Sequence, residues 1–106
     1  MENLKQTIEA VAERRDEITP DNVDPETFKA VEEAIGLLDR GEARVAEKQN
    51  GEWVVNEWLK KAVLVSFRIH SNRVMRGGET HYYDKVPAKY AEYGQSDFEA
   101  QGARVV

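Results

Sequence analysis

The chain has few side chains suited to catalysis or metal binding. Its two histidines are the first candidates. His70 and His81 are the only histidines among 106 residues, and the chain has no cysteine. A zinc site needs three or four ligands held close together, and no established motif spacing contains either histidine. We therefore interpret both as surface or helix-end residues and predict neither a metal site nor thiol catalysis.

Paired carboxylates are a second candidate, because they could act as acid and base. Asp16-Glu17 and Glu32-Glu33 should lie on the solvent faces of helices, whereas catalytic carboxylates usually need burial to tune them. Gly77-Gly78 has neither a following helix nor the lysine spacing of a phosphate loop, so we interpret it as a turn. We predict no catalytic residue and no cofactor-binding residue in this chain.

The remaining candidates are cations that could meet an anionic group. Most are scattered over the middle and later part of the chain, namely Lys60, Lys61, Arg68, Arg73, Arg76, Lys85 and Lys89. Lysines on a helix flank usually cover apolar surface with their stems while the charge stays in water. Arg104 differs, because it follows every predicted helix and could present a planar fork to a carboxylate. An ordinary edge-strand arginine is the alternative interpretation.

The elements that position these side chains are best defined between residues 41 and 69. Asn50-Gly51, between 44–49 and 52–55, predicts a β-hairpin with a type I′ turn. Asn56 then predicts a helix N-cap whose side-chain oxygen accepts a backbone N–H. The predicted helix over 57–70 is apolar on most of its circumference and should be the central buried element. Its apolar residues are Trp58, Leu59, Ala62, Val63, Leu64, Val65, Phe67 and Ile69.

Two amphipathic helices are predicted ahead of the hairpin. The first should have about four turns and end before Thr19-Pro20, since the residue before a proline is pushed out of the α region. The second should begin at Asp24-Pro25 and end at Gly41. Their apolar stripes consist of Leu4, Ile8, Val11 and Ala12, and of Phe28, Val31, Ile35 and Leu38. Because a lone two-stranded hairpin is not stable, the third helix should be the common packing partner.

The end of the chain predicts only short elements. Ser96 and Glu99 have the spacing of a capping box, so we expect a short helix over 96–101 that stops at Gly102. Residues 103–106 predict the opening of a β-strand. We favour core packing over ligand stacking for Trp53 and Trp58, because aromatic residues at element junctions usually supply buried area. The sequence thus predicts one α+β domain over residues 1–106.

Charge and hydropathy exclude several classes of function. The net charge is −5, with 11 acidic and 5 basic residues in 1–40 and 9 acidic and 10 basic residues in 41–106. An acidic domain without a basic stripe is a poor binder of nucleic acid. No run approaches the roughly 20 apolar residues that cross a bilayer, and the first residues lack the features of a signal peptide. We expect a cytoplasmic domain with neither nucleic acid nor membrane as a partner.

Several segments together point to a known family. In chain order they are ERRDEITP, GLLDRGEARVAEK, NGEWVVNEWLKKAVLVSFRI, YYDKVPAKYAEY and FEAQGARVV. This succession covers essentially the whole chain and resembles the N-terminal domain of bacterial tetrahydrodipicolinate N-succinyltransferase. The most specific parts are WLKKAVL, DKVP and the closing RVV, which occur in the same order and spacing.

The resemblance implies an acyltransferase of the diaminopimelate branch of lysine biosynthesis. That family moves a succinyl group from succinyl-CoA to tetrahydrodipicolinate and forms N-succinyl-2-amino-6-oxopimelate. Its members are homotrimers, with active sites between subunits and a left-handed parallel β-helix of hexapeptide repeats. In this sequence the β-helix would begin after residue 106. The succinyl-CoA pocket would therefore lie outside this domain, which we expect to bind no cofactor and to be inactive alone.

The resemblance also assigns a site residue. A substrate-binding arginine of the family maps onto Arg104, and a dicarboxylate substrate suits a guanidinium group. The domain's implied role is structural, since it would cover one end of the β-helix and help neighbouring subunits present Arg104 to the substrate. Two alternatives stay open: a stand-alone module that binds a protein through the third helix, and a small acid-binding regulatory domain. Contacts of Lys60, Lys61 or Arg68 with a neighbouring subunit also stay open.

Overall fold

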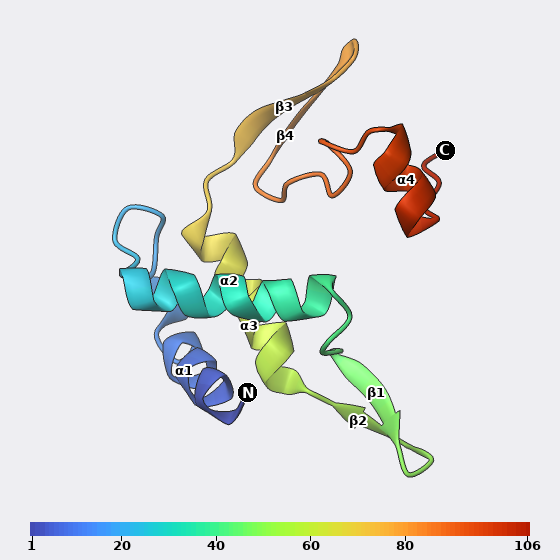
Figure 1. Ribbon diagram of the computed structural model, residues 1–106. Coiled ribbons are helices and arrows are strands. Elements are labelled where there is room, and N and C mark those ends of the chain that lie inside the picture. The colour runs from blue at the N-terminus through green and yellow to red at the C-terminus, as the bar shows by residue number, and fades with distance from the viewer. The chain divides into compact units, whose positions relative to one another are not determined.

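The computed structural model describes residues 1–106 and divides into two compact units, Met1–Ser71 and Asn72–Val106. Their elements confirm the predicted α+β class (Figure 1). The first unit contains α1 (Glu2–Ala12), a 3-10 turn η1 (Arg15–Glu17), α2 (Pro25–Asp39), β1 (Ala46–Gln49), β2 (Glu52–Val55) and α3 (Glu57–Ile69). The second unit contains β3 (Arg73–Gly77), β4 (Thr80–Asp84) and α4 (Gln95–Gln101).

Three helices build the core of the first unit. α3 packs against both α1 and α2, and these two also pack against each other. The side chains with almost no exposure come from all three helices and are Ile8, Val31, Ala34, Leu59, Ala62 and Val65. Small alanine side chains at such contacts let helix axes approach closely. α3 is therefore the common packing partner, as its apolar sequence predicts.

α2 begins as its sequence predicts. Asp24 is the N-cap, with Pro25 at the first helical position, and the Asp24 carboxylate accepts from the Thr27 backbone N–H at 3.2 Å. The Thr27 hydroxyl donates to the same carboxylate at 2.7 Å. These two hydrogen bonds lower the pKa of Asp24, the hydroxyl contributing more than the N–H. After the helix, Gly41 has φ of +75°, the left-handed conformation that ends many helices.

α1 ends at Ala12 after 11 residues, about three turns, so it is shorter than the predicted helix of about four turns. Arg14 has φ −118° and ψ 23°, which is outside the α region, and a separate 3-10 turn follows. The carbonyls of Arg15 and Asp16 accept from the Arg68 guanidinium on α3, at 3.1 and 2.9 Å. A donor more than 50 residues away thus satisfies backbone groups at this break, and no local pattern reveals it.

The first hairpin has the predicted turn. Asn50 and Gly51 both have positive φ, 52° and 82°, as a type I′ turn requires. Asn56 is the N-cap of α3, but its side chain does not cap the helix as predicted. Its amide instead donates to the Arg44 carbonyl at 2.7 Å, and its backbone N–H donates to the Val45 carbonyl at 2.7 Å. Asn56 thus joins the hairpin to the start of α3.

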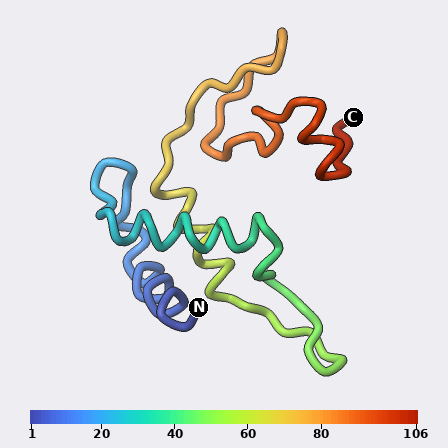
Figure 2. The backbone as a smooth tube through the Cα atoms, in the orientation of Figure 1, coloured from blue at the N-terminus to red at the C-terminus, as the bar shows by residue number.

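The two tryptophans have different surroundings, and only one belongs to the core. Trp58 on α3 is 8% exposed, as predicted, but Trp53 on β2 is 69% exposed. The prediction of core packing is therefore wrong for Trp53. Only the residues before the hairpin, Ala43 and Val45, pack against the helical core. Beyond them the strands reach away from the helices, as the trace in Figure 2 shows, so Trp53 has no core to enter.

The second unit holds a hairpin that the sequence analysis missed. β3 pairs with β4 in antiparallel register from Arg73 opposite Asp84 to Gly77 opposite Thr80. Gly78, at the first of the two turn positions, has φ of +65°, which fits the interpretation of Gly77-Gly78 as a turn. A Cβ at Gly77 would lie 3.2 Å from the Tyr82 ring. Glycine therefore suits both positions.

α4 has the predicted end but a different start. Gly102 has φ of +73° and ends the helix, while the N-cap is Gly94 rather than Ser96. The Gly94 N–H donates to the Asp97 carboxylate at 2.8 Å, so Asp97 replaces Glu99 in the cap. Residues 103–106 form no strand, because no neighbouring strand supplies hydrogen bonds.

Candidate functional site

Arg104 lies three residues after Gln101, the last residue of α4, and is exposed. The left-handed Gly102 ends the helical hydrogen bonding, because its N–H donates to the Phe98 carbonyl at 2.8 Å and the chain then leaves the helix. The Arg104 guanidinium has neither a hydrogen bond nor an ion pair within the chain. Its donors are therefore available to an external carboxylate, which a guanidinium can hold through two parallel hydrogen bonds.

Three aromatic rings hold together the segment that leads to Arg104. Tyr90, Tyr93 and Phe98 contact one another pairwise, with ring centroids 4.9 to 5.7 Å apart. Tilted and edge-to-face pairs of this kind add stability beyond the area they bury. The rings connect α4 to the loop before it. Sequence reasoning missed this cluster, although the spacing of Tyr90 and Tyr93 on one side of a turn was a usable signal.

A cleft of about 840 Å³ lies within the second unit. One wall is the β3–β4 hairpin, with Arg73, Met75 and Tyr82, and the other is the loop 86–92 together with Val105. Val105 places the cleft beside the segment that carries Arg104. Arg73 contributes an exposed cation, whereas the Arg76 guanidinium is 2.7 Å from His81 Nε2 and is partly occupied. The lining also includes the carboxylates Asp84 and Glu92, so the cleft combines apolar surface with charges of both signs.

The other histidine also has a partner. His70 is the C-cap of α3, and its Nε2 lies 2.7 Å from the Glu32 carboxylate on α2. The Phe28 ring meets the His70 ring edge-to-face, with centroids 5.4 Å apart. This contact ties the end of α3 to α2, which is a structural role and agrees with the interpretation of His70 as a helix-end residue.

The cations of α3 are used differently from one another. Arg68 donates to two backbone carbonyls in the 3-10 turn, as described above, so it stabilises the fold. Lys61 is half-buried and lines a small pocket of about 230 Å³ beside Glu13 and Asp16. Lys60 is exposed. No three or more His, Cys, Asp or Glu side chains are grouped so as to hold a metal ion.

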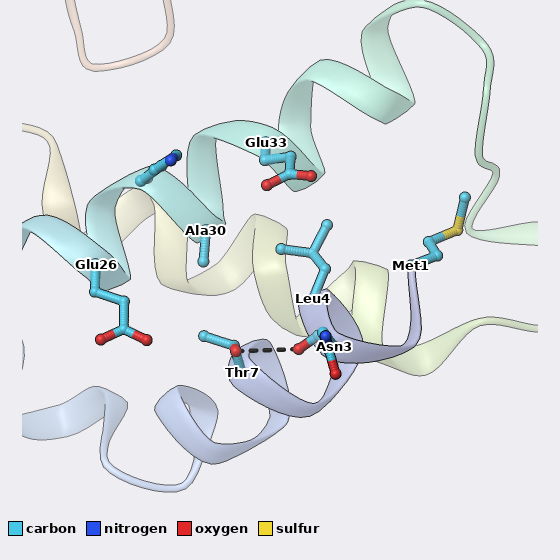
Figure 3. A pocket seen from close by; sticks show the side chains of 8 residues that line it. Met1, Asn3, Leu4, Thr7, Glu26, Ala30 and Glu33 are labelled. Atoms are coloured by element: carbon cyan, nitrogen blue, oxygen red, sulfur yellow. Dashed lines mark hydrogen bonds between the residues drawn. The ribbon is translucent and has the colours of Figure 1, made fainter.

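A groove of about 290 Å³ lies between α1 and α2 in the first unit. Figure 3 shows Leu4 on α1 facing Ala30 on α2, with Glu26 and Glu33 to either side of Ala30. The Thr7 hydroxyl is turned back to the Asn3 carbonyl at 3.0 Å. This groove thus has apolar surface from Leu4 and Ala30, and its lining includes Lys29 and the N-terminal residue Met1 as well as the two carboxylates. No helix of the chain has the length and apolar character needed to span a bilayer.

Comparison with known proteins identifies the family. The family model described as tetrahydrodipicolinate N-succinyltransferase N-terminal matches residues 3–69, which lie within the first unit. The chain belongs to this family. The predicted resemblance is therefore confirmed over α1, α2, α3 and the first hairpin.

Curated relatives are similar to this chain over its second unit as well as its first. The chain is 58% identical to the 2,3,4,5-tetrahydropyridine-2,6-dicarboxylate N-succinyltransferases of Thioalkalivibrio sulfidiphilus and Edwardsiella ictaluri, and 55% identical to that of Alkalilimnicola ehrlichii. Each similarity covers 100% of this chain and 39% of the relative. The chain thus spans about two-fifths of the length of these relatives.

Proposed function

We propose that this chain is the N-terminal domain of a tetrahydrodipicolinate N-succinyltransferase. The observation that carries the proposal is 55–58% identity over all 106 residues to relatives with that activity in their names. The reaction transfers a succinyl group from succinyl-CoA to the amine of ring-opened tetrahydrodipicolinate. It belongs to lysine and diaminopimelate biosynthesis, which takes place in the cytoplasm.

The two units together form one domain in this proposal, and a left-handed β-helix of hexapeptide repeats follows it. The relatives are much longer than this chain, which leaves room for such a domain. The second unit contributes an independent argument, because none of its residues is buried and Val74, Tyr82, Tyr83, Val86 and Val105 are more than half exposed. A unit of about 35 residues without a core needs a further surface to cover it.

Arg104 is the residue that we propose to bind substrate. Its side chain is exposed and has no polar partner in the chain, so binding a dicarboxylate would break no existing interaction. The cleft beside Val105 places a further cation, Arg73, in the same unit, where Asp84 is its cross-strand partner. Catalytic groups and the succinyl-CoA pocket lie in the following domain and in neighbouring subunits of a homotrimer.

An acyl-transfer assay with succinyl-CoA and tetrahydrodipicolinate tests this proposal. Residues 1–106 alone are expected to show no turnover, and a chain extended through the repeat domain is expected to be active. In the extended chain, Arg104→Ala should weaken substrate binding by about 1.5–3 kcal/mol, the usual value for a hydrogen bond to a charged group. Arg104→Lys should restore only part of this, since lysine cannot form the planar fork.

Arg44→Ala is the matched control, because Arg44 is also an exposed arginine but lies in the first unit. Its KM should equal that of the unchanged enzyme. Turnover by residues 1–106 alone would refute the division of labour between the domains. An Arg104→Ala enzyme with unchanged KM and kcat would refute the assignment of Arg104.

A further inference from the structure

The second unit, residues 72–106, has a cleft of about 840 Å³ but no buried side chain of its own. We propose that the segment of polypeptide that directly follows Val106 occupies this cleft. The inference rests on the proposed function, in which a further domain follows residue 106. It deepens that function because it names the surface on which the following chain packs.

The cleft has apolar side chains on both of its walls. Met75 and Tyr82 line it from the β3–β4 hairpin, and Val86 lines it from the loop 86–92. Tyr82 is 55% exposed and Val86 is 51% exposed, so a large part of their apolar surface remains in water. Covering such surface is favourable in proportion to the apolar area removed from water. The cleft therefore suits a segment that brings apolar side chains of its own.

The charges of the lining do not favour an ionic occupant. The charged side chains that line the cleft are Arg73, Arg76, Asp84, Lys89 and Glu92. Arg73 is the cross-strand partner of Asp84, and the Arg76 guanidinium donates to His81 Nε2 at 2.7 Å. The lining thus presents no cluster of a single sign, which the recognition of a charged partner would need.

The chain leaves the second unit at the cleft itself. α4 ends at Gly102, and three residues later Val105 lines the cleft. Val105 is 65% exposed, and Val106 is fully exposed. A segment attached to Val106 therefore begins beside the cleft. Tethering gives it a high effective concentration there, which favours it over a separate molecule of the same chemistry.

The relatives have enough further chain to supply this occupant. The similarity covers only 39% of their length, and the family model that matches residues 3–69 is described as N-terminal. That model ends close to Ser71, where the first unit ends, and it matches no residue of the second unit. This boundary is expected if residues 72–106 pack against the chain that follows them.

Amide hydrogen exchange tests the cover by comparing residues 1–106 with a chain extended through the following domain. In the extended chain, amides of β3, β4 and the loop 86–92 should exchange at least about tenfold more slowly, because local opening must then break further apolar contacts. Peptides from α3 check that both chains are folded. Equal exchange of the second unit in both chains would overturn the proposal. Slowing that appears in residues 1–106 as the concentration rises would identify a second copy as the occupant and would also overturn it.

Two adjacent tyrosines make the test specific to the cleft. Tyr82 and Tyr83 lie on opposite faces of β4, and only Tyr82 lines the cleft. In the extended chain, Tyr82→Ser should abolish the slowing around the cleft, and Tyr83→Ser, the matched control, should preserve it. The same two variants of residues 1–106 measure any direct effect on the hairpin. Equal losses at the two positions in the extended chain would contradict the proposal.

Disulfide trapping identifies the segment that occupies the cleft. Residues 1–106 have no cysteine, so Val86→Cys places a single thiol in the lining once any cysteine after residue 106 has been replaced by serine. A second cysteine is placed in turn at each of about six residues after Val106, which span roughly 20 Å when extended. Mass spectrometry should find a disulfide within one chain, and Tyr83→Cys, the control, should form none.

The trapping result separates this inference from the proposed function, because it needs no enzyme activity. A disulfide formed only between two chains would assign the cleft to a neighbouring subunit, and the absence of any disulfide would exclude the adjacent segment. Either result would overturn the inference. An active extended chain without the disulfide would contradict the inference alone. An inactive extended chain that forms the disulfide would contradict the proposed activity alone.

Discussion

The arginines of this chain show how surroundings decide the use of one chemical group. Arg68 gives its donors to two backbone carbonyls, Arg76 is hydrogen-bonded to His81, and Arg104 has no polar partner. A guanidinium stays protonated at any physiological pH and has only donors to offer. The available donors at Arg104 are therefore what a carboxylate substrate would need. The Arg68 guanidinium, by contrast, already donates to backbone carbonyls and stabilises the fold.

Asp24 gives a prediction about pH at the residue scale. Its pKa is lowered from 3.8 by hydrogen bonds from Thr27, first the hydroxyl and then the backbone N–H, with a smaller contribution from the Arg14 charge. The folded state therefore favours the carboxylate. This stabilisation is complete above the unfolded pKa and is lost as the pH falls through the lowered folded value. Asp24→Asn should thus lower the Tm at neutral pH, and the difference from the unchanged chain should disappear in acid.

Thermal melts from neutral pH down into acid below the ordinary carboxyl pKa measure this difference. Asn is itself a good N-cap, so the variant removes the charge while keeping an oxygen in place. Asp21→Asn is the control, because Asp21 is exposed and has no hydrogen bond. A Tm difference that stays constant over the whole pH range would contradict the role given to the Asp24 charge.

At the scale of elements, α3 has one face in the core and one face toward solvent. Leu59 is 1% exposed, and Leu64 on the same helix is 39% exposed. Leu59→Ala should reduce the free energy of unfolding by about 2–5 kcal/mol, because it leaves a cavity among packed side chains. Leu64→Ala, the same chemical change, should cost about 1 kcal/mol or less.

Urea unfolding followed by circular dichroism gives both free energies. The pair of variants separates burial from helix propensity, since each makes the same replacement in the same helix. Equal losses at the two positions would show that α3 is covered on both faces in solution, contrary to this structure.

The amino-acid sequence predicted the first hairpin but not the second. The residues around the two turns show why. Asn50-Gly51 specifies its turn locally, because both residues accept positive φ. Gly78 specifies a turn equally well, but the strands around it carry arginines, a histidine and an aspartate rather than a clear apolar alternation. The break after Ala12 had no local signal, because the donor that satisfies its carbonyls, Arg68, comes from α3.

At the scale of the whole molecule, the two units differ in what holds them together. The first has a core of twelve buried apolar side chains, whereas the second has none buried and relies on one hairpin and one aromatic cluster. Local opening costs little where few apolar contacts must break. Amides of α1, α2 and α3 should therefore exchange with deuterium far more slowly than amides of β3, β4 and α4.

Hydrogen–deuterium exchange with mass spectrometry resolves this difference by peptide. Within one sample the two units are matched controls for each other, since they experience the same solvent and temperature. Equal protection in peptides 1–71 and 72–106 would contradict the stability difference argued from burial.

The class of the fold, the three helices of the core, the first hairpin turn and the family could all be predicted from the amino-acid sequence. Each of these depends on side-chain periodicity, on turn residues with special φ, or on a conserved order of segments, and all of these are local along the chain. The tertiary structure alone decided which tryptophan is buried, which arginine is committed to carbonyls, and that residues 103–106 have no partner strand. Those outcomes depend on groups brought together from distant positions, because burial and hydrogen bonding are satisfied in space rather than along the sequence.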